Sequence, residues 1–472
     1  MIDMSRGLFV GIIVGTVSTV PILLMSRGSP LFSLLGVIVV PLLIICIVMP
    51  RSHFRLVNVL VPIVISELIF GGTGRWIGVG MFSGRQILFV IVLAAWIIDY
   101  LTSLKGVVSG RFWRYVLLAG FVAPLFWLLW SLGRGAQLQS AFGDLSFLFF
   151  FLAYFPISTW LRDGPPIDWA EGYLGGLLVM LAALWIFIPI STWKGIMPLT
   201  AFQWFAGTMS YFPNGFPRLC ANVDVFFPVG IWLGLFMWTW KLESNVAPSR
   251  SVRTSGFILF ASSAVALALT FSRAFWLAFV LVAFIGLGLG NVHWITRRQA
   301  RKLQMGLCIA ALMVVALMAN LSPDGLGRFY TVFDSSDQAN RIRTEERAEL
   351  ARAWETSPLL GNGFGIALPS GYVRSSENPY LFELQYDALL FKSGVIGLLL
   401  IIMVPFAAFI IFRRSIRQLF QPAKPRPAFL LFSLASGVLV TSIAGAFNPY
   451  LMSAYFPFLA VFLFALDDAV PN

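Results

Sequence analysis

The chain has 472 residues, of which 58% are hydrophobic and only 11% are charged. An ordinary soluble domain carries about 25% charged residues, so this composition excludes a soluble globular protein. The net charge of +12 could indicate nucleic-acid binding, but the basic residues stand in short loops beside apolar segments, as membrane orientation requires. We therefore predict a polytopic membrane protein with no nucleic-acid partner.

Apolar segments of about 20 residues, long enough to cross the hydrocarbon core, follow one another along the chain. They predict an all-α protein of about 14 transmembrane helices, within a range of about 12 to 14. Residues 255–290 form a single apolar run, which we divide into a hairpin at Ser272-Arg273 because one helix of that length would exceed any bilayer span. The predicted spans are 7–25, 31–49, 56–70, 86–103, 114–130, 145–161, 171–190, 223–240, 255–271, 274–290, 303–319, 388–412, 428–446 and 449–467.

Loop charge predicts the direction of these spans. With both termini in the cytoplasm, the inside loops carry more Lys and Arg than the short outside loops. The long polar segment 320–387 then lies outside. The predicted divisions are N-terminal transmembrane helices over 1–190, an extracytoplasmic aromatic loop over 191–222, transmembrane helices with the Ser-Arg hairpin over 223–319, the large extracytoplasmic loop over 320–387, and C-terminal transmembrane helices over 388–472.

Two arginines stand alone near the predicted outer surface. The loop 191–222 is rich in aromatic residues, which is typical of an interfacial belt, with a sugar-stacking or lipid-contacting lip as the alternative. Arg218 follows these aromatics, just before a span. Arg273 occupies the outer turn of the hairpin, where it either snorkels to the interface or binds a lipid-linked phosphate. Both are candidate anion-binding residues.

The large outer loop contains more arginine than orientation requires. Its middle, DQANRIRTEERAELARAWETS, predicts a helix capped by Ser336 or Asp337. Most of its charges fit a solvated helix with ion pairs, but arginine also binds phosphate in a bidentate manner and keeps its charge. The candidates for binding an anionic ligand are Arg341, Arg343 and Arg347. A glycine-rich turn, PLLGNGFG, follows and returns the chain toward the membrane.

Charged residues then enter the next span. Glu383, Asp387 and Lys392 stand at its mouth or inside it, where charges are costly and usually functional or paired. Tyr386 and Asp387 are candidate supporting residues, as is Lys392. An Asp387–Lys392 ion pair is allowed, although five residues is not the best helical spacing. Of these residues, Glu383 is the strongest candidate for a functional role.

Several short motifs together resemble the bacterial O-antigen ligase and polymerase superfamily. They are TFSRAFWLA at 270–278, the arginine-containing loop that passes Trp354 and ends in PLLGNGFG, FELQYDALLFKSGVIGLLL at 382–400, and Asn448-Pro449 before the last span. Their order and spacing carry the resemblance over roughly residues 200–465.

The resemblance implies a metal-independent, inverting membrane glycosyltransferase of the GT-C type, without a cofactor. It implies undecaprenyl-diphosphate-linked oligosaccharides as donor and acceptor, handled at the outer face of the bacterial cytoplasmic membrane. It also implies that Arg273, with Arg341 or Arg343, holds the diphosphate. The ligase histidine position is occupied by Glu383, which favours the polymerase branch. Candidate partners are membrane lipid and a chain-length regulator or export proteins.

Three functions remain open at this stage. A repeat-unit polymerase of a surface polysaccharide, such as an O-antigen or exopolysaccharide, is preferred. A ligase that transfers glycan to a lipid or protein acceptor is the second. A lipid-linked-sugar flippase or other transporter is the third, and it should show internal repeats and mid-membrane charges, whereas the charged features here gather at the predicted outer surface.

Overall fold

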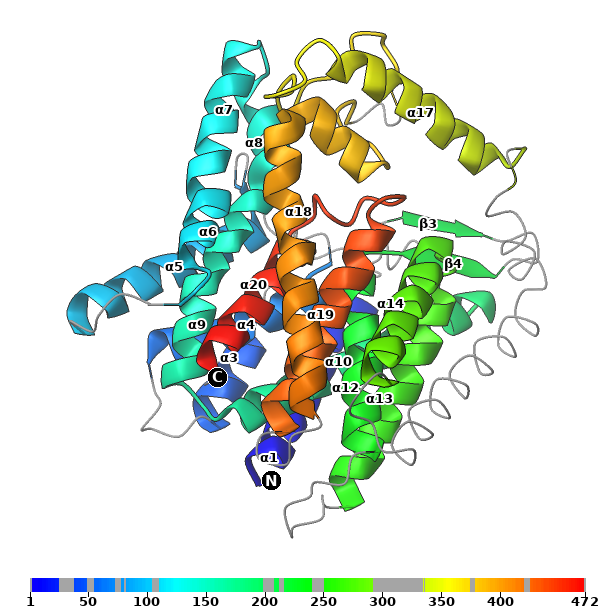
Figure 1. The fold of residues 1–472 in the computed structure, drawn as a ribbon. Helices are drawn as coiled ribbons and strands as arrows, with labels where there is room; N and C mark the ends of the chain where they lie inside the picture. The colour runs from blue at the N-terminus through cyan, green and yellow to red at the C-terminus, as the bar shows by residue number, and fades with distance from the viewer. Residues whose placement is uncertain are drawn as a thin grey trace.

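The computed structural model is a bundle of long helices (Figure 1). It describes residues 2–24, 38–48, 55–72, 78–79, 82–103, 110–197, 208–211, 216–239, 250–291, 334, 336–373, 378–419 and 425–470. The helices are α1 (Ile2–Leu24), α3 (Val40–Val48), α4 (Leu56–Phe70), α5 (Gly84–Ser103), α6 (Trp113–Leu117), α7 (Ala123–Gly133), α8 (Leu138–Phe149), α9 (Tyr154–Asp163), α10 (Ile167–Trp193), α12 (Phe227–Thr239), α13 (Arg250–Leu269), α14 (Arg273–Asn291), α17 (Gln338–Trp354), α18 (Gln385–Leu419), α19 (Pro425–Ala444) and α20 (Tyr455–Ala469).

The all-α polytopic class is confirmed. Eight described helical segments are long and apolar enough to cross a membrane, and three further apolar helices are shorter. A π-helical turn at Leu118–Val122 joins α6 to α7, and a 3₁₀ turn at Phe150–Ala153 joins α8 to α9. Thirteen of the fourteen expected spans overlap a helix, and the remaining one, 303–319, lies outside the described residues. The predicted hairpin within 255–290 is confirmed as α13 and α14.

Small residues allow α1 and α10 to pack closely against each other. A Cβ atom on Gly7 or Gly11 of α1 would stand 2.2 Å or 2.3 Å from the carbonyl oxygen of Trp169 or Tyr173 of α10. Glycine at these positions therefore permits direct backbone contact, the usual means of close helix packing in membranes. Most of α10 is consequently buried.

Two short hairpins depart from the purely helical expectation. Gly78–Val79 (β1) pairs with Phe82–Ser83 (β2), and Thr208–Tyr211 (β3) pairs antiparallel with Pro217–Cys220 (β4). The predicted aromatic loop 191–222 therefore contains a strand pair, in which Ser210 is the partner of Arg218. Main-chain pairing satisfies backbone polar groups that an irregular loop would leave unpaired.

Helix α18 is broken inside the bundle, at Gly394. This residue has φ 64° and ψ −167°, a conformation that is essentially restricted to glycine. At the break, Val395 and Ile396 donate backbone hydrogen bonds to the carbonyls of Pro358 and Leu359. The segment 358–365 thus packs against the interrupted helix, and α17 covers the end of α18 that precedes the break (Figure 1).

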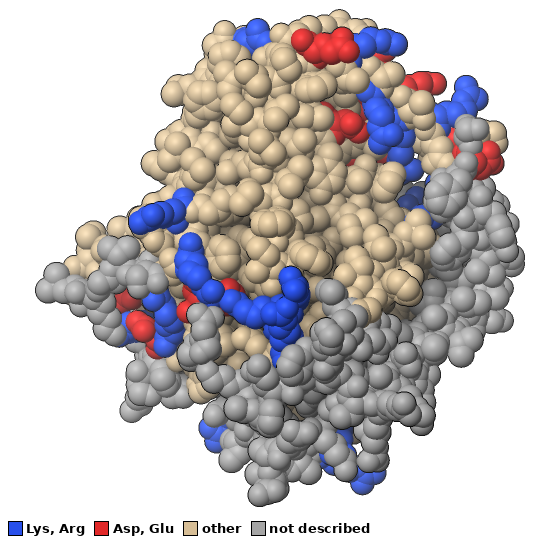
Figure 2. Space-filling view, viewed as in Figure 1, with Lys and Arg blue, Asp and Glu red and all other residues tan. Residues whose placement is uncertain are grey.

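Charged groups gather at the two ends of the bundle. Figure 2 shows a broad uncharged face between the charged residues at the α17 end and mainly basic residues at the other end. Large apolar side chains are exposed on the sides, among them Leu129 at 71% and Phe284 at 74%. An exposed apolar band between two polar ends is the surface that a lipid bilayer covers. Both termini lie in the half of the bundle remote from α17 (Figure 1).

Candidate functional site

The turn between α13 and α14 is shaped around Arg273. Phe271 has φ 49°, an uncommon conformation for a bulky residue, and its side chain is buried. Its ring lies between those of Phe216 and Trp276, with centroids 5.9 Å and 6.3 Å away. The Thr270 hydroxyl accepts a hydrogen bond from the backbone N–H of Ser272. This packing fixes Arg273 as the first residue of α14, with its side chain 15% exposed.

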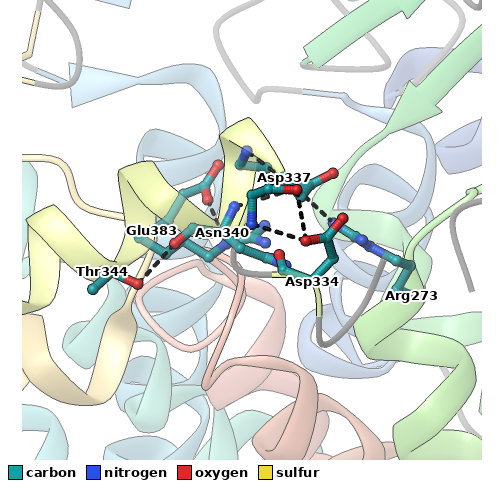
Figure 3. A network of polar contacts seen from close by, with 9 residues as sticks. Arg273, Asp334, Asp337, Asn340, Thr344 and Glu383 are labelled. Atoms are coloured by element: carbon teal, nitrogen blue, oxygen red, sulfur yellow. Dashed lines mark hydrogen bonds and ion pairs between the residues drawn. The ribbon is translucent and has the colours of Figure 1, made fainter. Parts of the chain in front are cut away.

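Arg273 forms an ion pair with the residue that caps α17. Its guanidinium lies 3.6 Å from a carboxylate oxygen of Asp337 (Figure 3). Asp337 accepts hydrogen bonds from the backbone N–H groups of Ala339 and Asn340, so of the two predicted caps, Ser336 and Asp337, the structure has Asp337. The start of α17 thus connects the α13–α14 hairpin with the predicted outer loop.

A second acid stands beside this cap. Asp334 accepts hydrogen bonds from the hydroxyl and the backbone N–H of Ser336, which lower the pKa of its carboxyl below the usual value. Asn340 donates from its side chain to the backbone carbonyl of Asp334 (Figure 3). These contacts order the chain immediately before α17 and keep a negative charge near Arg273.

Two further arginines of α17 meet the acids at the start of α18. Nε of Arg343 lies 3.0 Å from Oε2 of Glu383, and Nε of Arg347 lies 3.3 Å from Oδ2 of Asp387. Arg343 stands six residues after Asp337, which corresponds to about 9 Å along a helix. Arg273 and Glu383, distant in sequence, therefore contact the first two turns of the same helix (Figure 3).

Arg218 approaches the same region from β4. Its Nε is buried and has no hydrogen-bond partner within the described part of the chain. It lies beside the buried carboxylate of Asp224, with Tyr450 also next to that carboxylate. The Tyr450 ring packs on Phe275, two residues after Arg273, with centroids 4.5 Å apart. Arg218 is thus connected to α14 through Asp224, Tyr450 and Phe275.

Lys392 does not form the ion pair with Asp387 that its position allowed, and Asp387 pairs with Arg347. Lys392 instead pairs with Asp144 of α8, with Nζ 2.7 Å from Oδ1. Residues five apart project from different sides of a helix, and Lys392 faces the interior. The other Asp144 oxygen accepts from the backbone N–H of Gly365. Lys392 therefore supports the glycine-rich segment through Asp144.

The other candidate residues occupy less central positions. The Tyr386 hydroxyl donates to the backbone carbonyl of Ser442, which ties α18 to α19. Arg341 is exposed on α17. Sequence reasoning missed Glu346, a fully buried acid of α17, and Asp144, the partner of Lys392. The charge of Asp144 within an otherwise apolar segment was an available signal, whereas Glu346 stands among other charged residues and offered none.

Among the described residues, no group of three or more His, Cys, Asp or Glu side chains could hold a metal ion. The charges that converge here are guanidinium and carboxylate groups. Such a set can bind an anion of phosphate type and can accept a proton from a hydroxyl group.

Residues 258–402 match the family model described as O-antigen ligase. This match confirms the resemblance to the O-antigen ligase and polymerase superfamily. The matched segment includes Arg273, α17, the glycine-rich turn and Glu383, which are the parts that meet at the α17 end of the bundle. A search of curated proteins returns no match. The match indicates a membrane enzyme of the O-antigen ligase type, a family whose name implies lipid-linked glycan substrates.

Proposed function

We propose that this protein is a glycosyltransferase that polymerises undecaprenyl-diphosphate-linked oligosaccharide repeat units of a surface polysaccharide. The observation that carries the proposal is the convergence of Arg273 and Glu383 on the first turns of α17. The reaction takes place at the outer face of the bacterial cytoplasmic membrane, at the α17 end of the bundle.

In the proposed reaction, the arginines bind the diphosphate of the donor. Arg273 and Arg218 approach from the bundle, and Arg343 approaches from α17. In the transition state, negative charge grows on the phosphate oxygens as the bond between the anomeric carbon and phosphate breaks. Fixed guanidinium groups in a site of low dielectric constant stabilise that charge without a metal ion.

Glu383 acts as the general base. A hydroxyl oxygen of the acceptor sugar attacks the anomeric carbon, and its proton passes to the Glu383 carboxylate. The lipid diphosphate leaves with the electron pair of the broken bond. One direct displacement inverts the configuration of the anomeric carbon. A glutamate at this position supports the polymerase over the ligase, because the resemblance assigns a histidine to the ligases.

The ion pairs of the site imply an exchange of partners. Asp337 and Glu383 occupy two of the arginines that would hold the donor. A diphosphate carries more negative charge than one carboxylate and accepts bidentate bonds from arginine, so it competes for both. Donor binding would thus release Glu383 from Arg343 and free it to accept a proton.

The test is replacement of Arg273 by Ala and of Glu383 by Gln in the native host, with Arg413→Ala, in the C-terminal part of α18, as a control. We expect Arg273→Ala and Glu383→Gln to reduce the surface glycan to single repeat units while export stays intact. Arg413→Ala should leave the glycan unchanged. Loss of the link between glycan and its final acceptor, with chain length unchanged, would identify a ligase. Loss of outward translocation with both residues dispensable would identify a flippase.

A further inference from the structure

One face of α17 contacts the start of α18 at three successive points. Arg343, Glu346 and Arg347 share this face because residues three and four apart lie together on a helix. Arg343 contacts the Glu383 carboxylate, and Arg347 contacts the Asp387 carboxylate. Glu346 contacts the main chain between these two acids.

Glu346 differs from its neighbours in burial and in the group it binds. Its side chain has 0% exposure, and its Oε1 accepts the backbone N–H of Leu384 at 2.9 Å. Leu384 directly follows Glu383, and its own carbonyl accepts the N–H of Ala388 in the first turn of α18. A carboxylate here meets the positive end of a helix dipole. The bond therefore fixes the peptide that joins Glu383 to α18.

The apolar neighbours strengthen this attachment. Phe382 and Leu384, on either side of Glu383, are 3% and 1% exposed and belong to a small cluster with Leu350 of α17 and Phe391 of α18. Glu383 itself remains 25% exposed between them. The backbone of Glu383 is thus held on its buried side by Glu346 and by this apolar cluster, while its carboxylate remains partly exposed.

We propose that Glu346 is a positioning residue for Glu383, an inference that rests on the proposed function. Arg343 holds the carboxylate of Glu383 but is expected to exchange it for the donor diphosphate. Glu346 holds the backbone and does not take part in that exchange, so it keeps Glu383 in place after Arg343 has turned to the phosphate. A displacement of about 1 Å in a reacting group can cost about a hundredfold in rate, so loss of this hydrogen bond would lower turnover.

The experiment uses the purified full-length chain in detergent. Its substrate is lipid-linked repeat units extracted from a strain in which the gene for this protein has been deleted. Glu346→Leu removes the acceptor at similar size, and Glu346→Gln keeps a side-chain oxygen that can accept from Leu384. Glu345→Gln, on the exposed side of the same helix, is the matched control. We expect kcat to fall about tenfold or more for the Leu variant, with donor KM within about twofold. The Gln variant should retain at least about one third of kcat.

Activity is measured per folded protein, from the monodisperse fraction in size-exclusion chromatography. If Glu346→Leu does not fold, Glu346→Asp replaces it. The shorter aspartate side chain keeps the charge but withdraws the oxygen from the Leu384 N–H. For Glu346→Asp, kcat should fall while the donor KM stays close to that of the wild type. A wild-type kcat in Glu346→Leu, or in Glu346→Asp where it is used instead, would overturn the inference. An equal loss of kcat in Glu346→Gln and Glu346→Leu would also overturn it. Full turnover in Glu383→Gln would instead overturn the proposed function of the site.

Discussion

The buried ion pair between Asp144 and Lys392 offers a test of how the glycine-rich segment is held. The two side chains are 2% and 1% exposed, and their charged atoms lie 2.7 Å apart. Lys392→Met leaves the Asp144 carboxylate buried without its counter-ion. Breaking a buried pair in this way costs about 3–5 kcal/mol, because one charge remains in a medium that solvates it poorly.

The double variant Lys392→Met/Asp144→Asn should be far less destabilised than either single variant. Replacement of both partners removes both buried charges, which is often close to neutral. The amide introduced by Asp144→Asn also retains a side-chain oxygen that can accept the Gly365 N–H, the second hydrogen bond of this acid. We therefore expect a coupling free energy of at least about 2 kcal/mol between the two positions.

The assay is reversible unfolding in mixed detergent micelles, followed by the fluorescence of the 16 tryptophans. Lys194→Met, at an exposed lysine over the Trp193 ring, is the control and should change stability by less than about 0.5 kcal/mol. Additive effects of the two single substitutions, with no rescue in the double variant, would refute the assignment of Lys392 as a structural partner of Asp144.

Four further predictions concern the site and its supports. Asp337→Asn keeps an N-cap but removes the negative charge beside Arg273, so the donor KM should fall by about two- to fivefold; an unchanged or higher KM would contradict the exchange of partners. Phe271→Gly should be more stable to unfolding than Phe271→Ala by about 1 kcal/mol, the reverse of the usual order, because only glycine relieves the left-handed backbone. Gly394→Ala should cost about 1–3 kcal/mol in the same assay, whereas Gly133→Ala, whose Cβ would meet nothing within 4 Å, should be neutral. Transfer in vitro should persist in EDTA, and a loss of rate restored by Mg²⁺ would argue against charge stabilisation by arginine alone.

The sequence predicted those features that depend on local patterns. Apolar length and loop charge identified the helices, and the Ser272-Arg273 interruption identified the hairpin. Asp337 was one of the two candidate caps of α17, because an acid before a charged helical segment is a common start signal. These signals act over a few residues, and tertiary packing did not override them.

The contacts of the buried acids could not be predicted in the same way. Asp144 lies 248 residues from Lys392, and no local spacing relates them. Glu346 stands among charges that fit a solvated helix, and only the packing of α17 on α18 shows that it is the one charged residue of α17 that is buried. The side of a polar helix that is buried depends on what packs against it, and composition does not encode that.

The ion pairs at the α17 end of the bundle explain how several arginines can lie close together in the absence of a donor. Several guanidinium groups close together repel one another, and burial removes the water that would screen them. Asp337 beside Arg273 and Glu383 beside Arg343 offset that repulsion. In the proposed reaction, Glu383 both neutralises Arg343 and later accepts a proton, so one residue meets both requirements. The release of Glu383 from Arg343 would then depend on an anionic donor. Glu383 would therefore be available as a base only when the donor is bound.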